Sequence, residues 1–273
     1  MNAAARAGHA VRRVARHPAI TRTARAGLVG FGLVHLLIAW LAVLIALGRP
    51  APEGDQSGAL HQLAAQPAGV WLVGAVALGL AALVVWQATT ALAGPYRARA
   101  GEWGRRAIAA GRAVVYGAAA GTALGVLRHA RPSSAAQQQT ATARLMEAPG
   151  GRVFVGAAGV VVAAIGLGML GYGVLRRYER KLDTGRMPRP VRRLTAVAGV
   201  AGYGAKGVAY GVAGVLVLLA AVHFDPGRSR GLDAALRTLA AQPAGAWLLG
   251  AVALGFACYA TVCVIQSRYR TDL

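Results

Sequence analysis

Six long apolar stretches, separated by polar connections, dominate the pattern of the chain. Each is close to the roughly 20 apolar residues that a helix needs to cross the hydrocarbon core of a bilayer. A helix satisfies its own backbone amides, which have no water to bind inside a bilayer, so helix is the predicted structure of each stretch. The sequence therefore predicts an all-α membrane protein with six transmembrane helices. The stretches are residues 26–48, 68–93, 107–127, 153–175, 196–222 and 244–266.

An internal repeat is the most specific feature of the sequence. Residues 63–79 and 239–255 are identical at 15 of 17 positions, and a weaker third copy begins near Leu145. Because each copy contains two spans, every copy enters the membrane from the same side, as parallel repeats do. We expect the three tandem hairpins to form a pseudo-threefold bundle. The predicted units are a basic segment at residues 1–25 and hairpin repeats at residues 26–96, 103–178 and 192–270.

The basic residues predict the orientation of these hairpins. Twenty of the 30 Lys and Arg residues flank the spans on the side of the two termini, and eight lie in the connections on the other side. Under the positive-inside rule, the richer side faces the cytoplasm. The bias toward Arg, Ala and Gly is typical of a GC-rich bacterial genome. We therefore expect a multi-pass protein of the bacterial plasma membrane with both termini in the cytoplasm.

The outer connections and the glycines carry further predictions. Residues 57–66 and 231–241 each place apolar residues on one helical face and end at Gln-Pro, so we expect two short amphipathic helices on the outer surface. The Gln-rich connection of the middle repeat is expected to be mobile. Gly117, Gly121 and Gly125 are spaced four apart, which predicts close contact between helix backbones along the third span.

Composition and charge exclude several function classes. Hydrophobic residues make up 56% of the chain and charged residues 14%, well below the share of a soluble protein. The net charge of +21 suggests nucleic-acid binding, but the basic segment before the first span has no aromatic residue to stack on a base. No acidic residue lies within a span, and no spacing of Cys, His or acidic residues fits a metal or catalytic site. We expect no enzymatic activity, no catalytic or metal-binding residues, no cofactor and no nucleic-acid partner.

Two basic residues inside the spans are the candidates for a binding site. Lys206 and Arg112 occupy equivalent positions in the third and second repeats, where the first repeat has Phe31. Ionisable residues within spans usually face the interior of a bundle or a wet cavity. One interpretation is a site for an anion or an anionic lipid headgroup, lined by the polar residues one helical turn further on. Those residues are Tyr210, Tyr116 and His35.

A structural explanation of the same residues remains open. Both basic residues lie toward the cytoplasmic end of their spans, where a long basic side chain can extend along the helix to the membrane surface. In that case Lys206 and Arg112 would face lipid and bind no ligand. His35 by itself is more typical of a hydrogen-bonded packing residue than of a metal ligand.

The repeat resembles a known family. Residues 24–35 fit the pattern ARAG-x-x-x-x-G-x-x-[HY], and residues 63–79 fit LAAQP-x-G-x-WL-x-G-x-VALG. Both patterns resemble the bacterial domain of unknown function 1206, whose members carry three copies of two spans and are most familiar from actinobacteria. The resemblance is specific in the first and third repeats, whereas the second lacks the Trp and the Gln-Pro pair. It implies the same six-span architecture and no particular activity.

These observations favour a non-enzymatic structural or lipid-interacting component of the membrane, with membrane lipids as partners. The alternative is a channel or carrier for an anionic solute or lipid, which would use a cationic site between the hairpins. A continuous polar path past Lys206 and Arg112 would favour transport, and a dry, Gly-packed centre would favour the structural role.

Overall fold

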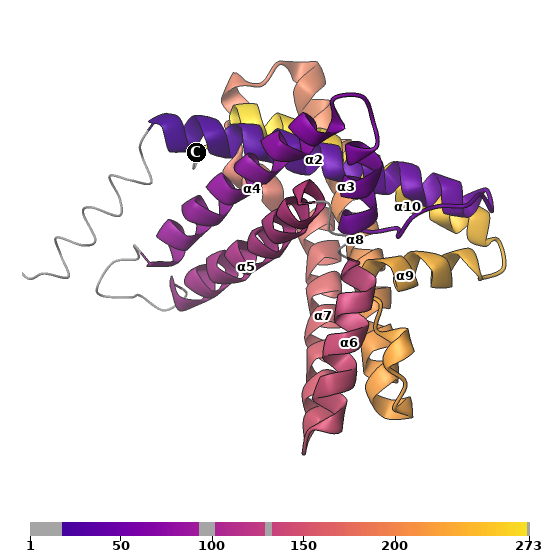
Figure 1. Ribbon diagram of the computed structural model, residues 1–273. Helices are drawn as coiled ribbons and strands as arrows, with labels where there is room; N and C mark the ends of the chain where they lie inside the picture. The colour runs from indigo at the N-terminus through magenta and orange to yellow at the C-terminus, as the bar shows by residue number, and fades with distance from the viewer. Residues whose placement is uncertain (1–17, 93–101, 129–132, 272–273) are drawn as a thin grey trace, which may run out of the picture.

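The computed structural model describes residues 18–92, 102–128 and 133–271, and within these ranges the chain is helical (Figure 1). Six of the helices are long and apolar enough to cross a membrane, which confirms the predicted fold class. The basic segment predicted at residues 1–25 lies mostly outside the described residues. The long helices are α2 (Pro18–Ala46), α4 (Gly69–Leu92), α5 (Glu102–Leu127), α7 (Gly151–Val174), α8 (Arg189–His223) and α10 (Gly245–Tyr269).

Short helices fill the connections. Two 3-10 helices lie between α7 and α8, where the chain has its richest run of basic residues, and a third precedes α9. The short helices are α3 (Gln56–Ala64), α6 (Ser134–Glu147), η1 (Arg177–Lys181), η2 (Thr184–Arg186), η3 (Pro226–Arg228) and α9 (Gly231–Ala240). The two predicted outer helices are therefore present as α3 and α9, whereas the Gln-rich connection, which was expected to be mobile, contains α6.

The long helices contact one another in the order α5, α4, α2, α10, α8, α7. Helix α2 of the first repeat packs extensively against α10 of the third, so these two repeats meet at the centre of the fold. Helix α7 packs along α8, and Figure 1 shows these two helices crossing the direction of α2 and α10 steeply.

The middle repeat is open. Its two spans, α5 and α7, pack against α4 and α8 respectively, at opposite ends of the series of contacts. The second span of each repeat packs against the first span of the next, with α10 returning to α2, as in a pseudo-threefold arrangement of three hairpins. The expected bundle is nevertheless incomplete, because α5 and α7 do not pack extensively against each other. Helix α7 instead packs along α8, where Gly166 and Gly207 allow the two backbones to approach closely.

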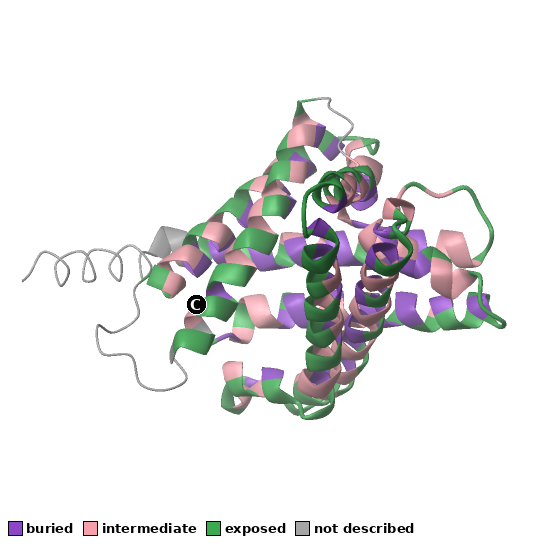
Figure 2. Ribbon diagram, turned by 90° about the horizontal axis from the view of Figure 1, so that it is seen from below, coloured by how far each residue is buried: buried purple, intermediate pink, exposed green. Residues whose placement is uncertain are grey.

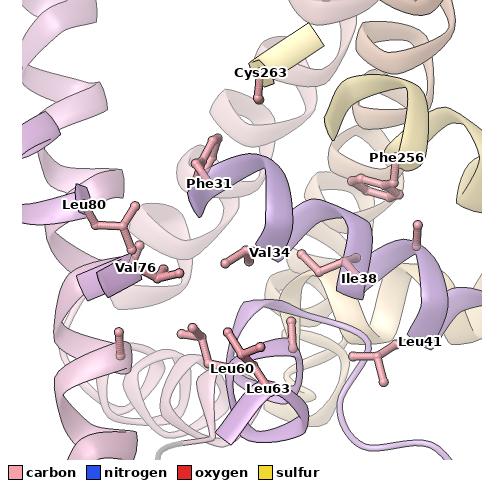
Figure 3. Close-up of a cluster of buried hydrophobic side chains, with 14 of the residues drawn as sticks. Phe31, Val34, Ile38, Leu41, Leu60, Leu63, Val76, Leu80, Phe256 and Cys263 are labelled. Carbon is pink, nitrogen blue, oxygen red and sulfur yellow. The ribbon is translucent and has the colours of Figure 1, made fainter. Parts of the chain in front are cut away.

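Helix α2 carries the largest hydrophobic core. Figure 3 shows α2 between three neighbours: Leu60 of α3, Val76 of α4 and Phe256 of α10 approach it from different sides. Buried residues line one face of each long helix, and exposed residues line the other (Figure 2). Helices α3 and α9 contribute to this core through buried residues such as Leu60 and Leu236, so their apolar faces turn into the protein and do not rest on the outer surface as expected.

Close backbone contact through glycine occurs between α7 and α8. A Cβ atom on Gly166 would lie 2.5 Å from the backbone nitrogen of Gly211, and one on Gly207 would lie 2.8 Å from the carbonyl oxygen of Gly166. The prediction for the third span is wrong at its centre, because Gly121 is exposed and a Cβ atom on it would meet nothing within 4 Å. Close glycine contact is therefore found between α7 and α8 and not at the centre of α5.

The α7–α8 contact generates a stability prediction. Gly166→Ala is expected to destabilise the protein by about 1–3 kcal/mol, because the added methyl group overlaps the backbone of α8. Gly168→Ala is the matched control on the same helix, since nothing lies within 4 Å of its Cβ position. Thermal unfolding of the purified variants in detergent measures the difference. Equal loss of stability in both would contradict this account of the helix contact.

Candidate functional site

Lys206 lies inside the protein and does not extend toward the membrane surface. Its side chain comes from the middle of α8, and the residue is 4% exposed. The ammonium nitrogen Nζ lies 3.0 Å from Nε2 of His35 on α2, and His35 is 5% exposed. The snorkelling explanation therefore does not describe Lys206.

The second ring nitrogen of His35 determines the chemistry of this contact. Nδ1 lies 2.8 Å from the backbone carbonyl oxygen of Phe31, one turn earlier in α2. A carbonyl only accepts, so Nδ1 carries the proton and donates it. Nε2 of a neutral imidazole then has a free lone pair, which accepts a hydrogen bond from the ammonium group of Lys206. This assignment follows from the hydrogen-bond partners.

Aromatic rings surround the rest of the ammonium group. Nζ of Lys206 lies 3.9 Å from the ring centroid of Tyr259, 5.3 Å from that of Phe31 and 5.8 Å from that of Tyr210. The faces of aromatic rings attract cations, most strongly where water is absent. Lys206 forms no ion pair with any of the residues that the structure describes. Its charge is therefore stabilised by an imidazole and three rings.

Equivalent positions of the repeats meet in this cluster. Phe31 corresponds to Lys206, and His35 and Tyr116 correspond to Tyr210. All three repeats therefore contribute residues to the cluster from the same two turns of their first span. The ring of Phe31 contacts that of Tyr116 on α5, with centroids 5.3 Å apart, and that of His35, with centroids 4.3 Å apart. The structure thus brings four of the five candidate residues, Lys206, His35, Tyr210 and Tyr116, into one cluster around Phe31.

Arg112 is the fifth candidate and has a different environment. It lies one turn before Tyr116 on α5, and its side chain is half-buried, in contrast to that of Lys206. Binding of an anionic group by Lys206 and Arg112 stays a prediction. In the described structure, the ammonium group of Lys206 already has His35 and the aromatic rings as partners.

Two residues of α10 belong to the cluster and were missed in the sequence. The ring of Tyr259 lies 4.8 Å from that of His35 and 5.3 Å from that of Tyr203, and Cys263 is buried one turn further along α10. The first repeat has Leu83 and Gln87 at the matching positions. A polar ring that replaces leucine within an otherwise well-matched repeat was the available signal.

A second polar cluster joins the repeats at the connections between their first and second spans. Glu53 accepts hydrogen bonds from the hydroxyl groups of Ser57 and of Ser133, the N-cap of α6. Burial opposes ionisation of Glu53, but these hydrogen bonds prevail and lower the pKa of its carboxyl group. Asp55 caps α3 by accepting from the backbone amides of Ser57 and Gly58, and burial raises the pKa of its carboxyl group.

Asp233 ties the third repeat to the first. It is fully buried at the start of α9 and accepts a hydrogen bond of 2.8 Å from the backbone amide of Gly54. Arg237, one turn later, lies 2.9 Å from the same carboxylate oxygen, and Arg230 lies 3.7 Å from the other one. No sequence pattern indicated this contact, because the acidic residues are scattered along the chain and the contact spans 179 positions.

A groove of about 440 Å³ lies between α6 and the C-terminal half of α5. Its α5 side is lined by small residues around Gly121, and its α6 side is lined by hydroxyl and amide groups. The lining residues are Ala118, Gly121, Thr122, Ser134, Gln137, Gln138 and Ala141.

Comparison with known proteins places the chain among its relatives. The Domain of Unknown Function (DUF1206) matches three times, at residues 26–94, 107–176 and 201–270. The chain belongs to the DUF1206 family. Each match covers one of the three hairpin repeats, including the open middle one. The chain is also 29% identical over 256 residues to "Uncharacterized protein YxxB" of Bacillus subtilis (strain 168), which covers 93% of this chain and 92% of the relative.

The family has no assigned activity, and no solved structure matches the chain. The relative comes from a Bacillus, so an actinobacterial source for this chain stays a prediction. In the ranges that the structure describes, no three His, Cys, Asp or Glu side chains gather closely enough to hold a metal ion.

The buried carboxylate generates a second stability prediction. Asp233→Asn removes the charge that holds Arg237 and weakens the acceptor for the amide of Gly54, so we expect a loss of about 1–3 kcal/mol. Asp225→Asn is the control, because its pair with Arg228 is exposed and contributes about 0–1 kcal/mol. Unfolding of the purified variants compares the two. A larger effect at Asp225 would show that Asp233 does not join the third repeat to the first.

Proposed function

We propose that the protein is a non-enzymatic component of the bacterial plasma membrane that binds phospholipid through its middle repeat. The observation that carries this proposal is the separation of α5 and α7, which belong to one repeat and pack against different neighbours. Each of these helices has a long apolar face that no other described part of the chain covers. In their most apolar windows only 17% of the residues are buried, against 39–50% in α2, α4, α8 and α10.

The chemistry of the exposed faces suits acyl chains. Val114 and Val115 on α5 and Val161 and Leu167 on α7 are all more than half exposed. Large apolar faces of this kind mark contact with lipid or with another protein. Lipid is the occupant that these faces favour, because both belong to spans and the polar groups of the groove lie at the outer end of α5, at the level of lipid headgroups.

The groove between α5 and α6 suits a phospholipid headgroup. Thr122, Ser134, Gln137 and Gln138 supply hydroxyl and amide donors for phosphate and glycerol oxygens. Arg144 lies two helical turns after Gln137 on α6 and so extends the same face with a positive charge. Small residues on α5 allow the headgroup to approach the helix backbone closely.

The centre of the protein supports a structural role over conduction. The ammonium group of Lys206 contacts the imidazole of His35 and three aromatic rings, and the α7–α8 interface is packed through glycine. This arrangement fits a dry centre packed through glycine, as expected of a structural protein, better than a continuous polar path for a solute. The Lys206 cluster thus serves to hold the repeats together, while the middle repeat meets the lipid.

Lipid retention tests the proposal. Gly121→Leu places a side chain into the groove, where nothing lies within 4 Å of the Cβ position, so the fold is preserved while bound phospholipid falls several-fold. Gly168→Leu adds the same side chain to an open position of α7 outside the groove and is expected to retain lipid. Native mass spectrometry of the two proteins in mild detergent counts the bound lipids.

Equal lipid retention by the two variants would reject the groove as a headgroup site. The double variant with Lys206→Met and Arg112→Met reports separately on the anion site predicted from the sequence. Loss of lipid in that variant alone would move the binding site to the cytoplasmic half of the spans.

Cysteine labelling tests the orientation. Gln66→Cys and Gln242→Cys introduce thiols at exposed positions that follow α3 and α9, and we expect them to react with a membrane-impermeant reagent added outside the cell. Gly185→Cys lies in the connection between α7 and α8 and should react only after lysis. The wild-type chain is the control, because both native cysteines lie within α10. The reverse pattern would place both termini outside.

A further inference from the structure

The hydrogen bond between His35 and Lys206 joins helices that belong to different repeats. Helices α2 and α8 each pack against α10, and the 3.0 Å contact between Nε2 of His35 and Nζ of Lys206 links them directly. Since α7 packs along α8, this contact also helps to determine how the α7–α8 pair is held against α2. A change in the contact can therefore alter the relation between the two parts of the fold.

The contact exists in only some protonation states. With Nδ1 of His35 donating to the carbonyl of Phe31, Nε2 accepts from Lys206 only while it carries no proton. The pair then holds a single positive charge. If the proton moves from Lys206 to Nε2, the bond reverses direction but survives, because the amine becomes the acceptor. A second positive charge removes the acceptor and leaves two cations about 3 Å apart.

Among the residues that the structure describes, the surroundings of the pair offer no compensation for a second charge. The titratable side chains that face the pair are Tyr210 from α8, Tyr259 and Cys263 from α10, and Tyr116 and Arg112 from α5. None is a carboxylate, and Arg112 adds a further positive charge. Helices α2, α4, α8 and α10 contain no acidic residue at all. Like charges at this distance repel by several kcal/mol at a moderate effective dielectric constant.

We propose that the His35–Lys206 pair is a proton-controlled latch between α2 and α8. The latch is closed while the pair carries one positive charge, and it opens when a second proton binds. Opening frees the α7–α8 pair to shift relative to α2 and so changes the distance between α7 and α5. Only acidification opens the latch, because deprotonation of Lys206 at alkaline pH leaves an amine that still donates a hydrogen bond to Nε2 of His35.

The direction of the pH effect follows from proton binding. The unfolded chain takes up a proton on His35 below about pH 6.5, whereas the closed latch excludes it. Stability therefore falls as the pH falls below this range, by up to about tenfold in the folded-to-unfolded ratio per pH unit for one proton. The same pair contributes no loss of stability between neutral and mildly alkaline pH.

Two variants test the latch in the full-length protein. His35→Gln keeps an oxygen acceptor for Lys206 and cannot be protonated, so we expect its loss of stability between pH 7 and pH 5 to be smaller than that of the wild type. Lys206→Met removes one of the two charges, so protonation of His35 no longer causes repulsion, and its acid-induced loss should also be smaller. His223→Gln changes an exposed histidine of α8 and should behave as the wild type.

A distance measurement separates a latch from a merely structural contact. Nitroxide labels at the exposed positions Val115 on α5 and Leu167 on α7, placed in nanodiscs, are expected to show a shifted distance distribution on acidification in the wild-type background. The same labels in the His35→Gln background should show no shift. A wild-type distribution that does not change between pH 7 and pH 5, or an equal shift in His35→Gln, would overturn the proposal. If His35→Gln does not fold, the comparison with Lys206→Met decides the question.

Discussion

A positive charge inside the protein is the constraint on which the rest of the fold depends. Removing an ammonium group from water costs several kcal/mol unless new partners replace the lost hydration. The partners of Lys206 come from α2 and α10 as well as from its own helix. A hydrogen bond that involves a charged group contributes about 1.5–3 kcal/mol, and each cation–π contact contributes about 0.5–2 kcal/mol. Three helices must therefore keep one register, because a slip of any of them leaves the charge without compensation.

The three repeats show how similar sequences can pack differently. The first span of each repeat places the same two helical turns near the centre. The first and third repeats nevertheless form most of the hydrophobic core, whereas α5 and α7 of the middle repeat lie at the two ends of the order of helix contacts. The difference agrees with the sequence, since the middle repeat has lost the Gln-Pro pair and the Trp that the other two share. The repeat that diverges most in sequence is thus also the repeat whose two spans are separated.

The sequence was sufficient to predict the six apolar helices, the repeats and the positions of the candidate residues, because these depend on local hydrophobicity and on comparison within the chain. It also indicated that His35, Tyr116 and Tyr210 occupy equivalent positions in the three repeats. The contacts of Phe31 and His35 with Tyr259 could not be predicted, because they depend on α2 packing against α10 across more than 200 residues. Gly121 was misjudged for a similar reason: glycine spacing permits a close helix contact, but only a neighbour of suitable shape, as α8 is for Gly166, produces one.

The meeting of α2 with α10 has a consequence for how the protein is made. Helix α2 precedes α10 by about 200 residues, so the most extensive partner of α2 is synthesised long after α2 itself. Until then α2 can pack only against α4 and other early helices. The imidazole of His35 has no hydrogen bond from Lys206 until the third repeat is made. Assembly of the centre therefore requires the third repeat, and truncation before α10 would remove the contact that joins the first repeat to the third.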